Sequence, residues 1–301
     1  MKKKRKMAKN LILKFFIIFC IGRYIIASPI VETWLHATIL IENEWGSKGT
    51  GFFVSRKVEG GLKILICTNK HVINEDDNLR ENATKLIFHL NIESDQGEII
   101  GTQVEFPLIL PNGVKRWKEH PDDDVDVLVL DVTNMIINNP QIRFKHDDVD
   151  QFAYPDILEK KDITIGDDIF ILGYPSGYSQ GKTNYPIVRQ GIIASQIGQI
   201  YIEKYKDDNG VEKERELRGF LIDGGLIPGS SGSPVILKPV IGRFVHGNIS
   251  MGGIQPYLLG IVAETRFAII PTVCGNILSY AGMGFAFDVS TIKETIDLFF
   301  K

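Results

Sequence analysis

Cysteine is scarce in this chain, since only Cys20, Cys67 and Cys274 occur among its 301 residues. So few cysteines exclude the dense disulfide framework that holds many small secreted domains together. Apolar residues make up 44% and charged residues 24%, a balance that excludes a disordered chain and a multi-span membrane protein. The length allows one large domain or two small ones.

After residue 28, lysine and arginine are fewer than aspartate and glutamate. Eight of the 34 lysines and arginines lie in residues 1–28, which contain no aspartate or glutamate. The remaining 26 stand against 37 acidic residues, a net charge of −11. A body this acidic, without a localised basic stripe, does not suit binding to phosphates, so we expect no nucleic-acid partner.

Residues 1–28 have the order of an export signal. The basic stretch Lys2–Lys9 precedes the largely apolar stretch Leu11–Ile26, and the small residue Ala27 follows. An uncleaved membrane anchor is the alternative, although the apolar stretch is marginal for a span of roughly 20 residues. Two basic residues interrupt the stretch and leave open that it is neither. Both leading interpretations place the body outside the cytoplasm (periplasmic, extracellular or anchored facing outside), with membrane contact only through an uncleaved N-terminal segment.

Short β-type runs recur every ten to fifteen residues from Ile30 onward. Most of them are β-branched or aromatic and are bounded by Gly, Pro, Asn or Asp. Regular strands without intervening helices predict an all-β sandwich or barrel. The expected strands include Ala37–Ile41, Gly51–Val54, Lys63–Cys67, Lys85–Leu90, Val127–Val132, Ile169–Leu172, Ile187–Ala194, Gln199–Tyr205, Gly219–Ile222, Val235–Leu237, Leu258–Ala263, Phe267–Ile270 and Gly284–Phe287.

Three segments between and after these strands have their own signals. Asn209-Gly210, inside a run of mixed charge, predicts the turn of a solvated β-hairpin. Thr291 and Glu294 have the spacing of a capping box and predict a C-terminal helix. The polar, Asp-rich segment Asn138–Lys161 is the best candidate for a linker between two halves.

A tight turn of small residues, Gly229-Ser230-Ser231-Gly232-Ser233-Pro234, suits a nucleophilic serine. Small neighbours let a substrate carbonyl approach, and they free backbone N–H groups to face a developing oxyanion. With Ser231 as nucleophile, the donors of this oxyanion hole would be the N–H groups of Gly229 and Ser231.

A serine nucleophile needs a base, and the base needs a carboxylate that orients it. His71 closely follows the apolar run Ile64–Cys67, which is a rigid place from which to present an imidazole. Asp126 opens the buried-type run Val127–Leu130, with Asp124 in the preceding acidic turn as the fallback. The order His71, Asp126, Ser231 is that of one known type of catalytic triad.

Together these motifs resemble the chymotrypsin-fold (trypsin-like) serine proteases, and most closely their bacterial high-temperature-requirement (Deg) branch. The motifs that carry the resemblance are Gly49-Thr50-Gly51-Phe52, Cys67-Thr68-Asn69-Lys70-His71-Val72-Ile73, Asp126-Val127-Leu128-Val129-Leu130, Leu172-Gly173-Tyr174-Pro175-Ser176-Gly177, Gly191-Ile192-Ile193-Ala194, Asp223–Pro234 and Gly282-Met283-Gly284-Phe285-Ala286. The serine motif with its upstream aspartate is the most specific of them.

The resemblance implies two six-stranded antiparallel β-barrels with the triad in the cleft between them. Residues 29–150 would form the first barrel, and 151–301 the second barrel plus a C-terminal α-helix. It also implies an exported endopeptidase that hydrolyses peptide bonds of a protein or peptide substrate through an acyl-enzyme. No cofactor and no metal are implied.

Several features depart from the family or are left open. Ser230 replaces the aspartate that pairs with a newly cut N-terminus in trypsin-like members, so the oxyanion loop must be ordered in another way. Ser233 replaces a glycine, and we expect no PDZ domain after the C-terminal helix. Whether Cys67 and Cys274 pair cannot be read from the sequence, although two buried free thiols are the default. The oligomeric state is open too.

By the same resemblance, the walls of the primary specificity pocket would come from three segments. Glu264 could face a basic substrate residue or point to solvent, and we favour solvent. The expected lining residues are Gly225, Leu226, Ile227, Ala263, Glu264, Thr265 and Gly284.

Two other functions compete with a protease. A catalytically weak scaffold of this fold could bind peptides or a partner protein, because the serine loop is unusual and has no evident ordering device. The same machinery could also hydrolyse esters that are not peptides. Whether a fluorophosphonate probe labels Ser231 distinguishes this binding scaffold from an active enzyme.

Overall fold

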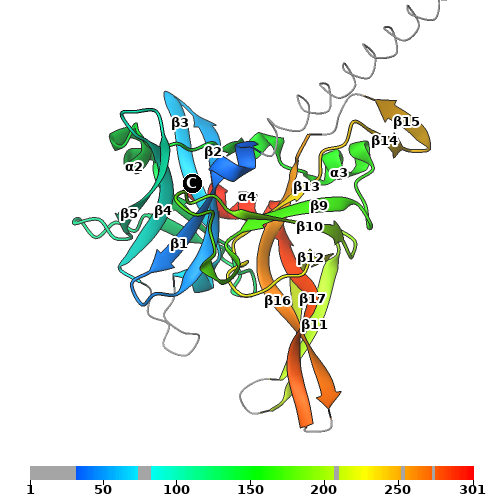
Figure 1. The fold of residues 1–301 in the computed structure, drawn as a ribbon. Coiled ribbons are helices and arrows are strands. Elements are labelled where there is room, and N and C mark those ends of the chain that lie inside the picture. Colours follow the sequence, from blue (N-terminus) through cyan, green and yellow to red (C-terminus); the bar gives the residue numbers. More distant parts are fainter. Residues whose placement is uncertain (1–31, 74–82, 207–209, 252–254, 273–274) are drawn as a thin grey trace, which may run out of the picture.

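The computed structural model of the chain describes residues 32–73, 83–206, 210–251, 255–272 and 275–301 (Figure 1). The segment expected to direct export, residues 1–28, lies outside these ranges, and so does Cys274. Within them, no helix is both long and apolar enough to cross a membrane.

The first half of the described chain forms an eight-stranded sheet with the strand order β5-β4-β1-β2-β3-β7-β6, and β8 pairs in parallel with β2. The sequential pairs β1–β2 and β2–β3 are antiparallel hairpins, which short polar or glycine-containing turns connect. The strands are β1 (Thr38–Asn43), β2 (Lys48–Val58), β3 (Gly61–Thr68), β4 (Lys85–Glu93), β5 (Ile99–Pro107), β6 (Trp117–Glu119), β7 (Leu128–Asp131) and β8 (Asp147–Asp148).

The second half forms a seven-stranded sheet with the order β10-β9-β13-β16-β17-β12-β11. An additional pairing of β10 with β12 closes six of these strands into a ring. The strands are β9 (Asp168–Gly173), β10 (Ile187–Ile193), β11 (Ile200–Lys206), β12 (Glu212–Asp223), β13 (Pro234–Leu237), β16 (Leu258–Thr272) and β17 (Gly275–Asp288), with β14 (Gly242–Val245) and β15 (Asn248–Met251) as a separate hairpin.

These sheets confirm the predicted all-β class with a short C-terminal helix. The segment Asn138–Lys161, expected to be a linker, is more structured than its composition suggested, because it holds β8 and two of the short helices. The helices are η1 (Lys70–Val72), α2 (Thr133–Asn138), η2 (Val149–Gln151), α3 (Pro155–Lys161), η3 (Pro175–Gly177) and α4 (Val289–Asp297), and residues 32–37 are helical as well.

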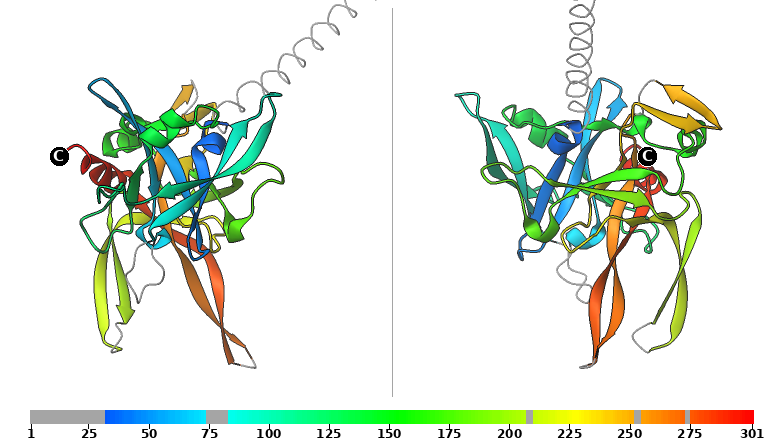
Figure 2. Two further views of the ribbon diagram at one scale, coloured as in Figure 1. Left: turned by 90° about the vertical axis from the view of Figure 1, so that its left-hand side faces the viewer. Right: turned by 45° about the vertical axis from the view of Figure 1, so that its right-hand side comes forward.

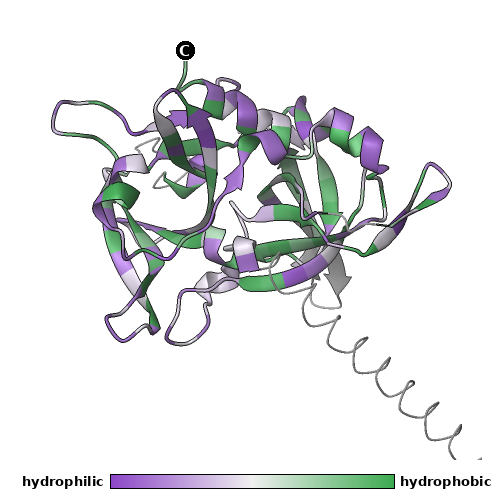
Figure 3. Ribbon diagram, turned by 90° about the horizontal axis from the view of Figure 1, so that it is seen from above, coloured by the Kyte–Doolittle hydropathy of each residue, from purple (hydrophilic) through white to green (hydrophobic). Residues whose placement is uncertain are grey.

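Two apolar cores fill the two sheets, and a third joins them. The joining core contains Phe52 and Leu65 of the first sheet together with Ile236 and Phe285 of the second. Figure 3 shows the hydrophobic stretches along the strands and the hydrophilic ones over the outer loops and helices. Cys67 is a free, buried member of the joining core, and burial raises the pKa of its thiol. The expectation of a buried free thiol is therefore confirmed for Cys67.

Two long hairpins leave the second sheet as arms (Figure 2). One is β11–β12, the hairpin that the run of mixed charge predicted, in which Glu203 pairs with Arg215. The other is the distal part of β16–β17, which remains paired from Phe267↔Tyr280 to Thr272↔Gly275. The arms extend the sheet well beyond the body of the protein.

The helix α4 begins differently from the capping-box prediction. Asp288 is its N-cap and accepts hydrogen bonds from the N–H groups of Ser290 and Thr291. The Glu294 carboxylate instead binds Arg218 at 2.6 Å and lies 3.1 Å from His120. The capping box was therefore wrong in detail, because Glu294 finds charged partners on other elements. Those contacts tie α4 to both halves of the chain.

Candidate active site

His71 lies in η1, the short turn that follows β3. The buried side chain of Val72 packs so closely on Gly49 of β2 that a Cβ there would lie 2.5 Å from it, and this contact fixes the turn against the sheet. The neighbouring imidazole points outward with 42% of its side chain exposed, and its Nδ1 lies 2.6 Å from Oδ2 of Asp126. With Nδ1 at the carboxylate, Nε2 is the ring nitrogen suited to exchange a proton with a reacting group.

Asp126 is held on several sides just before β7. Its Oδ1 accepts hydrogen bonds from the N–H groups of Lys70 at 2.6 Å and His71 at 3.2 Å. The Asn69 amide donates to the Asp126 carbonyl at 2.6 Å. Burial alone would raise the pKa of Asp126, but the His71 charge and these hydrogen bonds outweigh it and lower that pKa below its ordinary value. The carboxylate therefore stays ionised at neutral pH.

The fallback aspartate occupies a different position. Asp124 is exposed in the acidic turn, where its N–H donates to Oδ1 of Asp122 at 3.0 Å. The strand register therefore brings the carboxylate of Asp126 to the imidazole.

Ser231 lies in the loop between β12 and β13, directly against β2. Its carbonyl accepts a hydrogen bond from the N–H of Thr50 at 2.8 Å, and its hydroxyl donates to the carbonyl of Ala263 at 3.2 Å. Gly232 has a φ of +81°, and a Cβ there would lie 1.9 Å from the Thr50 carbonyl oxygen. This turn therefore requires glycine. The same carbonyl oxygen accepts from Thr68, three residues before His71, so Thr50 stands between the serine and the histidine.

Two backbone N–H groups in this loop belong to peptide groups whose carbonyl oxygens are held by hydrogen bonds. The Pro228 carbonyl accepts a hydrogen bond from the N–H of Ser176 at 2.8 Å, and the Ser230 carbonyl accepts one from the N–H of Ser233 at 3.1 Å. Because a trans peptide points its C=O and N–H in opposite directions, the N–H groups of Gly229 and Ser231 face away from these partners. Neither N–H has an acceptor among the residues that the structure describes. They are available to an anionic oxygen.

The sequence did not reveal what orders this loop. The Thr50 hydroxyl donates to the Gly229 carbonyl at 3.0 Å and accepts from the Tyr174 N–H at 3.2 Å. The Ser176 N–H donates to the preceding carbonyl, that of Pro228. Thr50 and Ser176 each belong to a motif that the sequence did reveal, but their roles depend on contacts between distant segments. Together they provide an ordering device that needs no aspartate at Ser230.

The residues expected to line the specificity pocket converge on β16 and β17. Gly284 opposes Thr265 across the strands, and a Cβ on Gly284 would lie 2.1 Å from the buried Leu226 side chain. Ala263 is buried, Gly225 is exposed and binds the Gly282 carbonyl at 2.9 Å, and Ile227 is half-buried. The Glu264 carboxylate binds Arg215 of β12 at 2.9 Å, and its side chain stays partly exposed to solvent.

Ser233, which stands where the family has glycine, is completely buried, and its hydroxyl has no hydrogen-bond partner among the described residues. An unsatisfied buried hydroxyl destabilises the folded state. We therefore expect Ser233→Ala to raise the free energy of unfolding by about 1 kcal/mol. Urea unfolding of both proteins measures the difference, and a clear loss of stability in the variant would contradict the expectation.

Comparison with known proteins identifies the family. The family model for the trypsin-like peptidase domain matches residues 49–245, a span that contains His71, Asp126 and Ser231. No curated protein matches the chain.

Solved structures of similar chains include the active form of the Rv3671c protease from M. tuberculosis, at 15% identity and a TM-score of 0.46, over 90% of this chain and 84% of that one. Deg5 is similar at 16% identity and a TM-score of 0.45, over 89% and 90% of the two chains. The HtrA-type protease AlgW with tripeptide has 17% identity and a TM-score of 0.41, over 90% of this chain and 61% of AlgW. With the domain match over most of its length, the chain belongs to the trypsin-like peptidase family and is a serine protease.

Proposed function

We propose that the chain is an exported serine endopeptidase of the Deg type that cleaves protein or peptide substrates through Ser231, His71 and Asp126. The observation that carries the proposal is the 2.6 Å contact between His71 and Asp126, together with the binding of the Ser231 turn to Thr50, which Thr68 also contacts three residues before His71. Export rests on the order of basic and apolar residues before residue 28.

In the proposed reaction, Ser231 attacks the scissile carbonyl while His71 Nε2 takes its proton. Asp126 stabilises the imidazolium and keeps Nδ1 protonated. The N–H groups of Gly229 and Ser231 bind the oxyanion of the tetrahedral intermediate. His71 then gives its proton to the leaving amine, and water hydrolyses the acyl-enzyme. In the structure the Ser231 hydroxyl donates to the Ala263 carbonyl, so the proposed attack requires it to leave this bond and turn to the imidazole by rotation about its Cα–Cβ bond.

One observation favours a second candidate function. Because the Ser231 hydroxyl donates to the Ala263 carbonyl, the resting serine is not engaged with its base. A protease-like scaffold that binds peptides or a partner protein without useful turnover is consistent with this arrangement.

Labelling with a fluorophosphonate separates the two functions. The full chain is treated with the probe and the adduct is located by peptide mapping. For a protease we expect a single adduct on Ser231 that disappears in the His71→Ala variant, since only an activated serine reacts. A folded sample without any adduct would support the scaffold instead.

Thr50 offers a test of how the oxyanion loop is ordered. In Thr50→Val the hydrogen bond to the Gly229 carbonyl is lost, so the N–H donors are held less firmly. We expect kcat to fall by about 10-fold, less than the 10²–10³ typical for loss of a donor itself, with KM little changed. Thr50→Ser keeps a hydroxyl and should restore most of kcat. Equal kinetics for Val and Ser variants would show that the hydroxyl has no such role.

The pocket walls point to a preference for uncharged substrate side chains. Leu226, Ala263 and Gly284 are apolar, and the Glu264 carboxylate is engaged with Arg215, which also binds Glu203. We expect peptides with an apolar residue before the cleaved bond to have a kcat/KM at least 10-fold above those with lysine or arginine there. A lysine or arginine side chain buried in this pocket would need a carboxylate partner to offset its desolvation. Profiling with a peptide library measures this ratio, and a basic preference would contradict it.

A further inference from the structure

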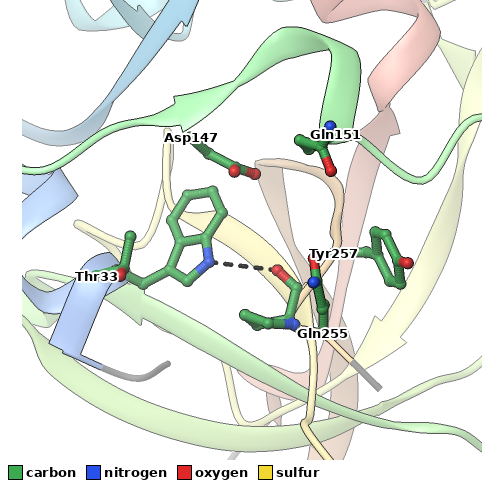
Figure 4. A pocket seen from close by; sticks show the side chains of 7 residues that line it. Thr33, Asp147, Gln151, Gln255 and Tyr257 are labelled. Carbon is green, nitrogen blue, oxygen red and sulfur yellow. Dashed lines mark hydrogen bonds between the residues drawn. The ribbon is translucent and has the colours of Figure 1, made fainter. Parts of the chain in front are cut away.

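A cavity of about 280 Å³ lies where residues 32–37, β8 and the segment before β16 meet (Figure 4). None of the residues placed in the candidate active site lines it, and its walls come from both halves of the chain. The lining residues are Thr33, Trp34, Asp147, Gln151, Gln255, Pro256 and Tyr257.

Asp147 supplies the charge in this cavity. Its strand β8 pairs with β2 at Val54, which fixes the backbone, and its carboxyl group points into the cavity. Oδ1 accepts the N–H of Asp148 at 3.1 Å, and no lysine or arginine among the described residues forms an ion pair with the carboxylate. Burial raises the pKa of Asp147 to about 7, and the like charge of Asp148 adds to the effect. The ionised carboxylate therefore lacks a counter-charge.

The remaining walls suit a cation that carries hydrogen-bond donors. The side-chain amides of Gln151 and Gln255 have no partner among the described residues and so have free acceptor oxygens. Trp34 forms an aromatic wall, fixed by its N–H bond to the Pro256 carbonyl at 3.4 Å and by edge contact with Phe52. Aromatic rings attract cations, and the other six lining residues carry no charge at neutral pH.

We propose that this cavity binds an organic cation, a guanidinium or alkylammonium group such as a polyamine or a basic peptide side chain carries. A divalent metal ion would need about six oxygen ligands, whereas this cavity has one carboxylate and an indole wall. The volume is just below the range of about 300–1,000 Å³ for drug-sized ligands, which suits a group the size of one side chain. The site is independent of the proposed proteolytic function.

Calorimetric titration of the full chain tests the site with two probes, agmatine and arginine capped at both ends. The variant is Asp147→Asn, which keeps the bond to the Asp148 N–H but removes the charge. Its matched control is Asp148→Asn, whose carboxylate pairs with Lys57 at 3.2 Å and is not a lining residue. Melting temperatures without ligand establish that all three proteins are folded.

We expect at least one probe to bind at pH 8.5, and Asp147→Asn to lose at least 10-fold in affinity while Asp148→Asn keeps it. Affinity should also fall as the pH drops below about 7, because protonated Asp147 no longer attracts a guanidinium. Tighter binding of agmatine would indicate a polyamine-type ligand, and tighter binding of the capped arginine a peptide side chain. Binding by Asp147→Asn equal to that of the unaltered chain, or no binding of either probe, would overturn the proposal.

Discussion

Ser231→Ala is expected to lower kcat for peptide hydrolysis on the order of 10⁵-fold, because the variant lacks the oxygen that attacks the substrate carbonyl. The residual rate would come from the oxyanion hole and substrate binding alone. The Ser231 hydroxyl makes a single hydrogen bond, to the Ala263 carbonyl, so the fold should survive its loss. Steady-state kinetics on a cleaved peptide, together with a melting curve, measures both effects.

Ser233→Ala is the matched control, since it removes a hydroxyl two residues further along the same loop. It should keep kcat, because the Ser233 side chain is buried away from solvent and has no partner among the described residues. Undiminished hydrolysis by purified Ser231→Ala protein would rule out Ser231 as the nucleophile. A comparable loss in both variants would instead point to damage of the loop.

Asp126→Asn is expected to lower kcat by about 10⁴-fold while leaving the site geometry intact. The asparagine oxygen can still accept the N–H groups of Lys70 and His71, which now bind Oδ1. Its amide nitrogen would then face Nδ1 of His71 and force the proton onto Nε2. An imidazole in that tautomer cannot take the proton of Ser231.

Asp124→Asn provides the matched control for this prediction. Asp124 is exposed in the turn before Asp126, so the change should leave kcat within about 2-fold. Kinetics at pH 8 on both variants decides between the two aspartates. If Asp124→Asn loses activity and Asp126→Asn keeps it, the assignment of the orienting carboxylate is wrong.

Much of this molecule could be predicted from local patterns. β-branched and aromatic runs bounded by turn residues predicted most strands, and Asn209-Gly210 predicted the β11–β12 hairpin. His71 and Asp126 could be singled out because each adjoins a strand end, where local sequence and position in the fold coincide.

Long-range contacts explain what the sequence did not reveal. The hydroxyl of Thr50 meets Gly229 across 179 residues of chain, and no local pattern encodes that contact. Glu264 occupies a position expected in the pocket wall, but Arg215 binds it from β12, two strands away in the sheet. Thr291 has the spacing of a capping residue, yet the helix begins earlier at Asp288 because that carboxylate receives the first free N–H groups.

The hydrogen bond from the Thr50 N–H to the Ser231 carbonyl joins the two sheets at the candidate active site. His71 and Asp126 belong to the first half of the chain and Ser231 to the second, so the proposed catalytic triad would be assembled only while the two sheets are packed together. A partial separation of the two sheets would abolish the proposed activity before the core of either sheet unfolds. In rising denaturant, turnover should therefore disappear at lower concentrations than circular dichroism does, and dilution should restore it within the time of redocking rather than of refolding.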